Sequence, residues 1–165
     1  MGFEKQYKET IELLEQIITE PNNKEKQIIP HCLRVGNYLY SNNYSQDVII
    51  AGLLHDAIEW GPTSKEKLAL KYNNHILAIV IANTKDKTIK DQQERRKDYI
   101  KRCAMVGIDA LIVKAADMLD SYSFYTNNNN TKEIERCEDI ARLLIMHWPE
   151  ENNDMIIQEV KKVLK

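Results

Sequence analysis

Hydrophobic residues recur at three- and four-residue intervals along most of this 165-residue chain. The first such stretch predicts an amphipathic helix over residues 3–20. Its apolar positions are Phe3, Tyr7, Ile11, Leu14 and Ile18. The whole chain has only five glycines, which leaves little material for the tight turns of hairpins. The pattern therefore predicts an all-α fold.

Helix breakers and capping residues divide the rest of the chain into further helices. Pro21-Asn22-Asn23 ends the first helix, and Pro30 fits the first turn of the second. The residues expected to cap later helices are Ser45, Thr63 (paired with Glu66), Asp91 (paired with Glu94) and Asp109. We expect the later helices at about 30–40, 46–60, 64–72, 74–84, 92–105, 110–125, 131–147 and 151–164. No interdomain linker or repeat is visible, so residues 1–165 are expected to form one domain.

Three of these helices carry ionisable residues where the pattern expects apolar ones. His55 and Asp56 lie within the run Ala51-Gly52-Leu53-Leu54-His55-Asp56-Ala57-Ile58-Glu59, and Asp117 lies within a similar run. His31 begins another apolar helix. Burying such groups is costly unless something compensates them, and neutral imidazole and carboxylate are both good metal ligands. We therefore predict one metal site formed by His31, His55, Asp56 and Asp117. The alternative is that hydrogen bonds alone satisfy these groups.

Composition narrows the class of partner. The chain has 25 acidic and 23 basic residues, and its net charge of −2 gives no general attraction to nucleic acid or to an anionic membrane. Cys32, Cys103 and Cys137 are odd in number and lack CxxC spacing, which favours free thiols in a reducing compartment. The N-terminal residues form no signal-peptide pattern, and no segment is apolar enough to span a membrane. We expect a soluble cytoplasmic protein.

The order of the four candidate ligands resembles the H…HD…D signature of the HD superfamily of metal-dependent phosphohydrolases. Within it, the chain is most similar to the RelA/SpoT-type (p)ppGpp hydrolase domain and to small stand-alone alarmone hydrolases. The similarity covers about residues 24–125. The family stretches YI-x-HP-x-x-VA, ALLHD-x-x-ED, TD-x-K and KLAD-x-x-x-N correspond here to IIPHCLRVG (28–36), AGLLHDAIEW (51–60), TKDKT (84–88) and KAADMLDS (114–121). The resemblance implies an HD domain with one divalent ion, most readily Mn²⁺, with Fe²⁺, Co²⁺ or Zn²⁺ as alternatives.

Glu59 is the candidate catalytic residue. It follows His55 by four positions, so both side chains are expected on one helix face, with the carboxylate near the metal. That geometry suits a group that orients or deprotonates the attacking water. The family uses a Glu-Asp pair here, whereas this chain has Trp60 after Glu59. We therefore expect weak or absent (p)ppGpp hydrolysis and better activity on another nucleotide or small phosphorylated metabolite.

Five residues are candidates for binding the substrate. Lys85 and Lys87 lie on a polar loop and can contact phosphate. Lys114 precedes Asp117 by three residues and can contact a phosphate or a carboxylate. Ser121, which replaces the family's asparagine, is expected near the sugar. Trp60 can stack on a base or narrow the pocket.

Two other functions remain open. A 5′-nucleotidase-type HD phosphomonoesterase also uses HD-x-x-E, but that family has a further acidic residue where this chain has Ser64. A non-catalytic, metal-stabilised binding module would retain the ligands, with Trp60 filling the pocket. The sequence gives no basis for an oligomeric state.

Overall fold

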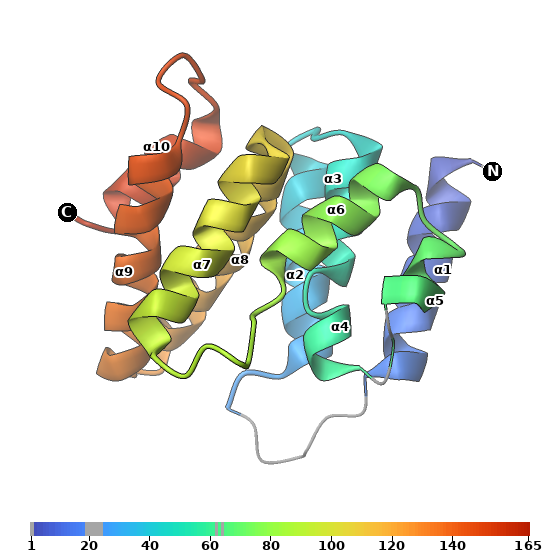
Figure 1. The fold of residues 1–165 in the computed structure, drawn as a ribbon, viewed down its shortest axis with the longest axis horizontal. Coiled ribbons are helices and arrows are strands. Elements are labelled where there is room, and N and C mark those ends of the chain that lie inside the picture. Colours follow the sequence, from blue (N-terminus) through green and yellow to red (C-terminus); the bar gives the residue numbers. More distant parts are fainter. Residues whose placement is uncertain (1, 19–24, 62, 64) are drawn as a thin grey trace.

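The structure is a computed structural model that describes residues 2–18, 25–61, 63 and 65–165. Within these residues it is helical and contains no strand, so the expected all-α fold is confirmed (Figure 1). The helices are α1 (Phe3–Ile17), α2 (Ile28–Ser41), α3 (Gln46–Leu54), α4 (Ala57–Trp60), α5 (Lys65–Ala69), α6 (Asn74–Asn83), α7 (Gln92–Val106), α8 (Ile108–Asn127), α9 (Thr131–His147) and α10 (Met155–Lys162). The expected break at Pro21-Asn22-Asn23 and the position of Ser64 lie outside the described residues.

The long helix α8 is the centre of the packing. It contacts α2, α3, α6, α7, α9 and α10, while α1 and α10 lie at opposite ends of the molecule (Figure 1). The apolar helix α3 is buried along most of its length, from Val48 to Leu54. The helices that carry the candidate metal ligands therefore meet inside one hydrophobic core, in which His31 and His55 are buried.

Two glycines allow α2 and α3 to approach closely. A Cβ atom at Gly36 would lie 2.3 Å from a methyl carbon of Leu53, and one at Gly52 would lie 2.3 Å from a methyl carbon of Leu39. Neither position has room for a larger side chain without a shift of its neighbours. This close approach brings His31 on α2 next to His55 at the end of α3.

The helix expected from the Ser45 cap to residue 60 is instead interrupted at the His-Asp pair. The helix α3 ends at Leu54, α4 begins at Ala57, and Asp56 has φ −100° and ψ −1°. The ring nitrogen Nδ1 of His55 lies 2.7 Å from the carbonyl oxygen of Gly52, a contact that holds the imidazole against its own helix. The expectation of one continuous helix was therefore wrong. The chain turns at His55 and Asp56, and this turn directs both side chains toward the other candidate ligands.

Other helix boundaries differ for local reasons. Asp109 does not cap α8; Gly107, with φ 129°, occupies the N-cap position, and Asp109 forms an ion pair with His75. The last helix, α10, begins at Met155 because Asp154 caps it, and the preceding residues form a turn held by Trp148 Nε1 to Asn152. The helix α5 ends at Ala69, three residues before the expected end. Asp91 caps α7 as expected.

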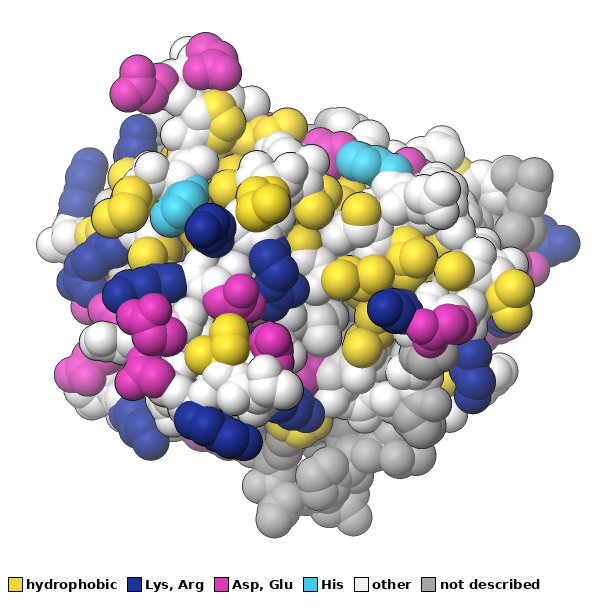
Figure 2. Space-filling view, in the orientation of Figure 1, with side chains coloured by type: hydrophobic (Ala, Val, Ile, Leu, Met, Phe, Trp, Pro, Cys, Tyr) yellow, Lys and Arg dark blue, Asp and Glu magenta, His cyan; other side chains and the backbone are white. Residues whose placement is uncertain are grey.

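The surface agrees with the nearly balanced charge of the chain. Figure 2 shows Lys and Arg side chains interspersed with Asp and Glu on the side of α7 and α9, with apolar side chains toward the middle of this face. None of the helices in the described ranges combines the length and apolarity that a membrane-spanning segment requires.

Candidate metal centre and active site

The structure brings the four candidate metal ligands together. Nε2 of His31 lies 3.1 Å from Nε2 of His55 and 3.0 Å from Oδ1 of Asp117. Oδ2 of Asp56 lies 3.5 Å from Nε2 of His55 and 3.9 Å from Nε2 of His31. Both histidines are buried. The ligand atoms of His31, His55 and Asp117 thus all lie within 4.8 Å of one another, and Asp56 adjoins this group through its contacts with the two imidazoles.

The outer nitrogens of the imidazole rings show why this arrangement suits a cation. Nδ1 of His55 faces the carbonyl oxygen of Gly52, which can only accept, so Nδ1 carries the hydrogen. Nδ1 of His31 faces the carboxylate of Asp120 at 2.6 Å and donates to it in the same way. In the neutral rings, both Nε2 lone pairs then point at each other. A divalent ion between them would satisfy both lone pairs and the two carboxylates.

The charge around His55 also favours a cation. Burial alone would lower the pKa of His55, but Asp56 and Asp117 outweigh it and raise that pKa above its ordinary value. A proton on the imidazole can therefore balance part of the negative charge when no metal is present. Proton and metal compete for the same lone pair, so metal binding is expected to release protons.

Asp120 and Arg34 support His31 from behind, and the sequence reasoning missed both. Arg34 donates to Asp120 through Nε at 2.7 Å and through Nη2 at 3.0 Å. Burial would raise the pKa of Asp120, but the hydrogen bonds from His31 and Arg34 lower it below its usual value. Each of these residues follows a metal ligand by three positions in the sequence, a helical spacing that could have revealed them.

Lys114 contacts a carboxylate, which is one of the two roles that the sequence left open. Its ammonium lies 2.9 Å from Oδ2 of Asp117 and 4.7 Å from the ring centroid of Tyr99, and the residue is buried. Burial would raise the pKa of Asp117, but Lys114 and the two histidines hold it well below its usual range. Asp117 is therefore an anion with Oδ1 directed to the histidines and Oδ2 held by Lys114.

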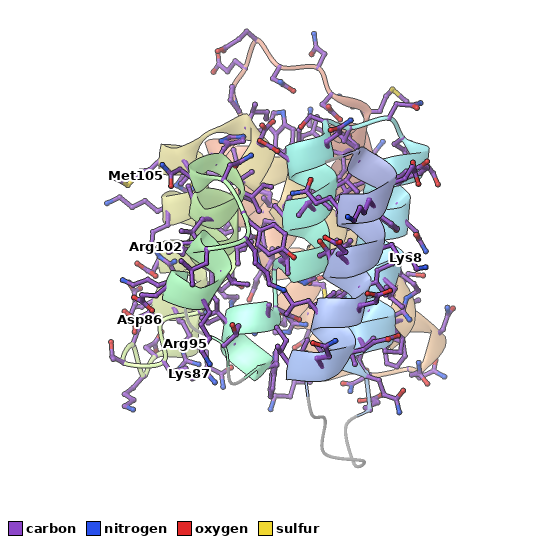
Figure 3. The ribbon with its side chains drawn as sticks, turned by 90° about the vertical axis from the view of Figure 1, so that its right-hand side faces the viewer. Lys8, Asp86, Lys87, Arg95, Arg102 and Met105 are labelled. Atoms are coloured by element: carbon purple, nitrogen blue, oxygen red, sulfur yellow. The ribbon has the colours of Figure 1, made fainter. Side chains whose placement is uncertain are left out.

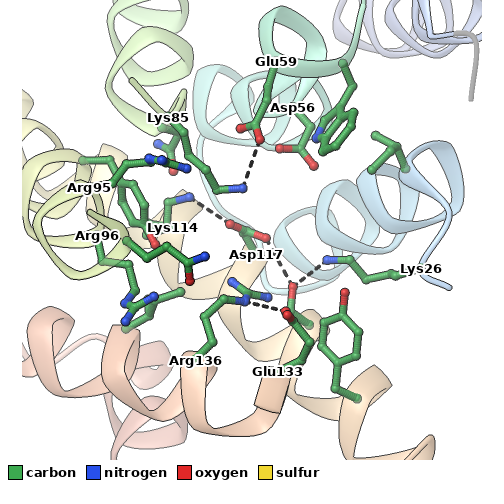
Figure 4. Close-up of a pocket in the computed structure, with 18 residues that line it drawn as sticks. Lys26, Asp56, Glu59, Lys85, Arg95, Arg96, Lys114, Asp117, Glu133 and Arg136 are labelled. Atoms are coloured by element: carbon green, nitrogen blue, oxygen red, sulfur yellow. Dashed lines mark hydrogen bonds and ion pairs between the residues drawn. The ribbon is translucent and has the colours of Figure 1, made fainter. Parts of the chain in front are cut away.

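A cavity of about 330 Å³ opens beside the metal ligands Asp56 and Asp117 (Figure 4). Positive side chains dominate its charged lining, and this excess suits a ligand with several negative charges. The basic residues are Lys26, Lys85, Arg95, Arg96, Lys114 and Arg136, and the acidic residues are Asp56, Glu59, Asp117 and Glu133.

Glu59, the candidate catalytic residue, lines this cavity and is paired with Lys85. Oε1 of Glu59 lies 3.0 Å from Nζ of Lys85, and the Glu59 side chain is only 5% exposed. Burial would lower the pKa of Lys85, but the charges of Glu59 and Asp56 raise it. Lys85 is therefore protonated at neutral pH. The α4 helix carries Glu59 to the cavity wall even though His55 and Glu59 do not share one continuous helix.

The remaining substrate-binding candidates lie in or beside the cavity. Trp60 and Ser121 line it. The hydroxyl of Ser121 accepts a hydrogen bond from Nζ of Lys26 at 2.6 Å. Nζ of Lys87 lies 5.5 Å from the ring centroid of Trp60 and 3.4 Å from the carbonyl oxygen of Glu59. Figure 3 shows Lys87 and Arg95 at the same end of α7. Binding of substrate by these residues stays a prediction.

Several cavity residues gave no usable signal in the sequence. Arg136 and Glu133 come from α9, pair at 2.6 Å, and belong to no motif. Asn83, at the end of α6, donates to the carbonyl oxygens of Ile79 and Ala110. Its Oδ1 is the buried side-chain polar atom without a hydrogen-bond partner among the residues that the structure describes.

An HD domain family model matches residues 11–143, a range that includes all four candidate metal ligands. The chain is 26% identical over 143 residues to "Guanosine-3′,5′-bis(diphosphate) 3′-pyrophosphohydrolase MESH1" of Drosophila melanogaster, covering 86% of this chain and 71% of that protein. It is 27% identical over 123 residues to "Guanosine-3′,5′-bis(diphosphate) 3′-pyrophosphohydrolase" of Aquifex aeolicus, covering 70% of this chain but only 18% of that protein.

Two solved structures share the fold. One is a metazoan ortholog of SpoT described as hydrolysing ppGpp, with a TM-score of 0.73 at 18% identity over 98% of this chain and 93% of that one. The other is lmo0812 from Listeria monocytogenes EGD-e, with a TM-score of 0.69 at 18% identity over 88% of this chain and 96% of that one. At this identity, the likeness shows a common fold.

Proposed function

The chain belongs to the HD domain family of metal-dependent phosphohydrolases, as its sequence predicts, and we propose that it hydrolyses a nucleotide with phosphate groups at both the 3′ and 5′ positions. Guanosine 3′,5′-bis(diphosphate) is the leading candidate, because the curated relatives from Drosophila and Aquifex are named for its 3′-pyrophosphohydrolysis. The products would be pyrophosphate and a nucleotide with a 3′-hydroxyl.

The observation that carries this proposal is the placement of the cationic side chains around Asp117. Figure 4 shows Lys85, Arg95 and Arg96 on one side of Asp117 and Lys26 on the other, with Arg136 between the two sides below it. A single phosphate next to the metal ligands could contact the cations on only one of these two sides. A substrate with phosphates at two positions would use both sides while one phosphorus lies next to the metal ligands.

The metal would be held by His31, His55, Asp56 and Asp117, and a divalent ion there would polarise a phosphate oxygen and lower the pKa of a bound water toward ~7. Glu59 would orient this water or accept its proton. The water oxygen attacks the phosphorus bonded to O3′, the bond from that phosphorus to O3′ breaks, and O3′ takes a proton. The ammonium and guanidinium groups neutralise the charge that develops on the phosphate.

The other substrate contacts follow from the positions of the side chains. Ser121, which lies beside Asp117, would contact the sugar, and Trp60 would stack on the base or narrow the entrance. We further propose Mn²⁺ as the ion, with Fe²⁺, Co²⁺ or Zn²⁺ as alternatives, because two imidazoles and two carboxylates suit these metals. The cytoplasm is the proposed location, since the three cysteines are buried and unbridged, as expected in a reducing compartment.

A nucleotide hydrolysis screen with Mn²⁺ tests the proposal. The expected result is release of pyrophosphate from guanosine 3′,5′-bis(diphosphate), with Asp117→Ala as the inactive control. Release of inorganic phosphate from nucleoside monophosphates would instead indicate a 5′-nucleotidase-type phosphomonoesterase. Binding of the metal without turnover of any nucleotide would indicate a non-catalytic binding module.

A further inference from the structure

The ion pair between Glu59 and Lys85 is a feature of this chain that the family pattern does not contain. The family pattern that this sequence resembles, with its Glu-Asp pair and TD-x-K loop, implies an aspartate at each of the positions of Trp60 and Lys85. This chain has a tryptophan and a lysine there. The ammonium of Lys85 contacts the carboxylate of Glu59 at 3.0 Å.

The two partners differ in their access to the cavity. The Glu59 side chain is 5% exposed, whereas the Lys85 side chain is 35% exposed, and both line the cavity next to Asp56. Lys85 therefore lies on the open side of the pair. The more exposed Lys85 is thus the partner more accessible to an incoming phosphate, and its ammonium occupies one oxygen, Oε1, of the Glu59 carboxylate.

Other cationic groups of the cavity are held more firmly. The guanidinium of Arg95 donates to the carbonyl oxygens of Ile89 and Lys90. The ammonium of Lys114 is buried against Asp117. Lys85, by contrast, extends from a loop on a flexible four-carbon side chain and is partly exposed. Among these three groups, it is the one that can change partner with little rearrangement.

We propose that Lys85 exchanges Glu59 for a phosphate of the substrate, and that this exchange releases the Glu59 carboxylate to act on the attacking water. The inference rests on the proposed function in taking a phosphate compound as substrate and Glu59 as the group that handles water. A phosphate that carries up to two negative charges attracts the ammonium more strongly than one carboxylate does. The base is thereby uncovered only when a phosphate is in place.

Binding of inorganic phosphate to the Mn²⁺-loaded protein, measured by calorimetry, tests the exchange without any turnover. Glu59→Gln should bind phosphate roughly five- to tenfold more tightly than the parent, because Lys85 no longer has to leave a carboxylate. In the Lys85→Gln background this gain should vanish, and in the Lys85→Arg background it should return. Glu94→Gln is the matched control, since it removes the same charge from an exposed Lys97–Glu94 pair outside the cavity.

The exchange is overturned if Glu59→Gln gives no gain, if the gain persists without a cation at position 85, or if Glu94→Gln gives an equal gain. Kinetics supply an independent readout. Lys85→Gln should raise KM about tenfold and lower kcat by a smaller factor, because the variant loses one cation from the phosphate site but leaves Glu59 without its ammonium partner. A large fall in kcat with an unchanged KM would show that Lys85 acts on the transition state alone and would reject the exchange. The phosphate measurement remains informative even if guanosine 3′,5′-bis(diphosphate) proves not to be the substrate.

Discussion

Nδ1 of His31 lies 2.6 Å from Oδ2 of Asp120, while Nε2 of the same ring faces His55 and Asp117. The imidazole is thus held from both sides. A carboxylate behind a ligating histidine fixes its tautomer and orientation and increases its basicity toward the metal. Arg34 holds the carboxylate in turn. Residues outside the candidate ligand set are therefore expected to contribute to metal affinity.

Asp120→Ala is expected to weaken metal binding by roughly 10- to 100-fold, because His31 loses the acceptor that orients it. Competition with a chromogenic chelator measures this affinity directly. The matched control is Asp109→Ala, which removes the partner of another histidine, His75, on the surface. An equal loss of affinity in both variants would contradict a specific role for Asp120.

Metal removal is expected to lower the melting temperature of the parent protein, because the ligands join α2, the α3–α4 turn and α8. At a metal concentration about 100 times Kd, linkage gives about 2.7 kcal/mol of added stability. Asp117→Ala should lose most of this metal-dependent increase in Tm, as well as the activity. The comparison is made within each protein, with and without chelator, because removing Asp117 also leaves the buried Lys114 without its carboxylate. An equal increase in both proteins would argue against Asp117 as a ligand.

Glu59→Gln is expected to separate water activation from metal binding. If the carboxylate acts on water, the variant should keep about one metal ion per chain and lose roughly a hundredfold or more in kcat. Elemental analysis and steady-state kinetics on the same sample measure the two quantities. Loss of the metal would reassign Glu59 to the ligand set, and an unchanged kcat would remove it from the mechanism.

Trp60→Asp is expected to increase hydrolysis of guanosine 3′,5′-bis(diphosphate), because it restores the second carboxylate of the related hydrolases. An indole cannot accept a proton from water, so the unmodified protein should turn this nucleotide over more slowly than the variant does. Trp60→Phe, which keeps an aromatic ring, is the control and should give no increase. Turnover by the unmodified protein as fast as that of Trp60→Asp would show that Glu59 is sufficient and would reject the expectation, drawn from the sequence, that another compound is preferred.

The three thiols are expected to react slowly in the native protein. Burial raises the pKa of Cys103 to about 11 and that of Cys137 to about 11, and it raises the pKa of Cys32 well above its ordinary value. At pH 8 the reactive thiolate is therefore scarce in the folded state. Titration with an aromatic disulfide reagent should show little reaction natively and three thiols after denaturation. Fast native labelling would contradict this burial.

The clustering of the candidate metal ligands was predictable because their signal is local. An ionisable residue among apolar neighbours is anomalous wherever it occurs, and four such residues lie together as expected. The break after Leu54 was not predictable from periodicity, because it depends on the contact of His55 with the backbone of Gly52 and on the tertiary environment of the pair. The pairing of Glu59 with Lys85 joins residues 26 positions apart and requires the folded arrangement of α4 and the loop after α6.

The place of Arg136 in the cavity could not be predicted from the sequence for the same reason. Its helix, α9, carries no motif and reaches the cavity only because α9 packs on α8. Asp120 is different, since its spacing from Asp117 was visible in the sequence. A search for carboxylates one turn away from each candidate ligand would have found it. Sequence patterns therefore predicted the cluster of candidate metal ligands better than they predicted the lining of the cavity.

The site consists of two parts whose residues come from different helices. The candidate metal ligands come from α2, the α3–α4 turn and α8, whereas Arg95, Arg96 and Arg136 come from α7 and α9. A substitution on α7 or α9 can thus alter which phosphorylated compound is accepted without disturbing the core that holds the ion. Natural or laboratory evolution can therefore change the substrate specificity through α7 and α9 while the helices that carry the candidate metal ligands keep their sequence and fold.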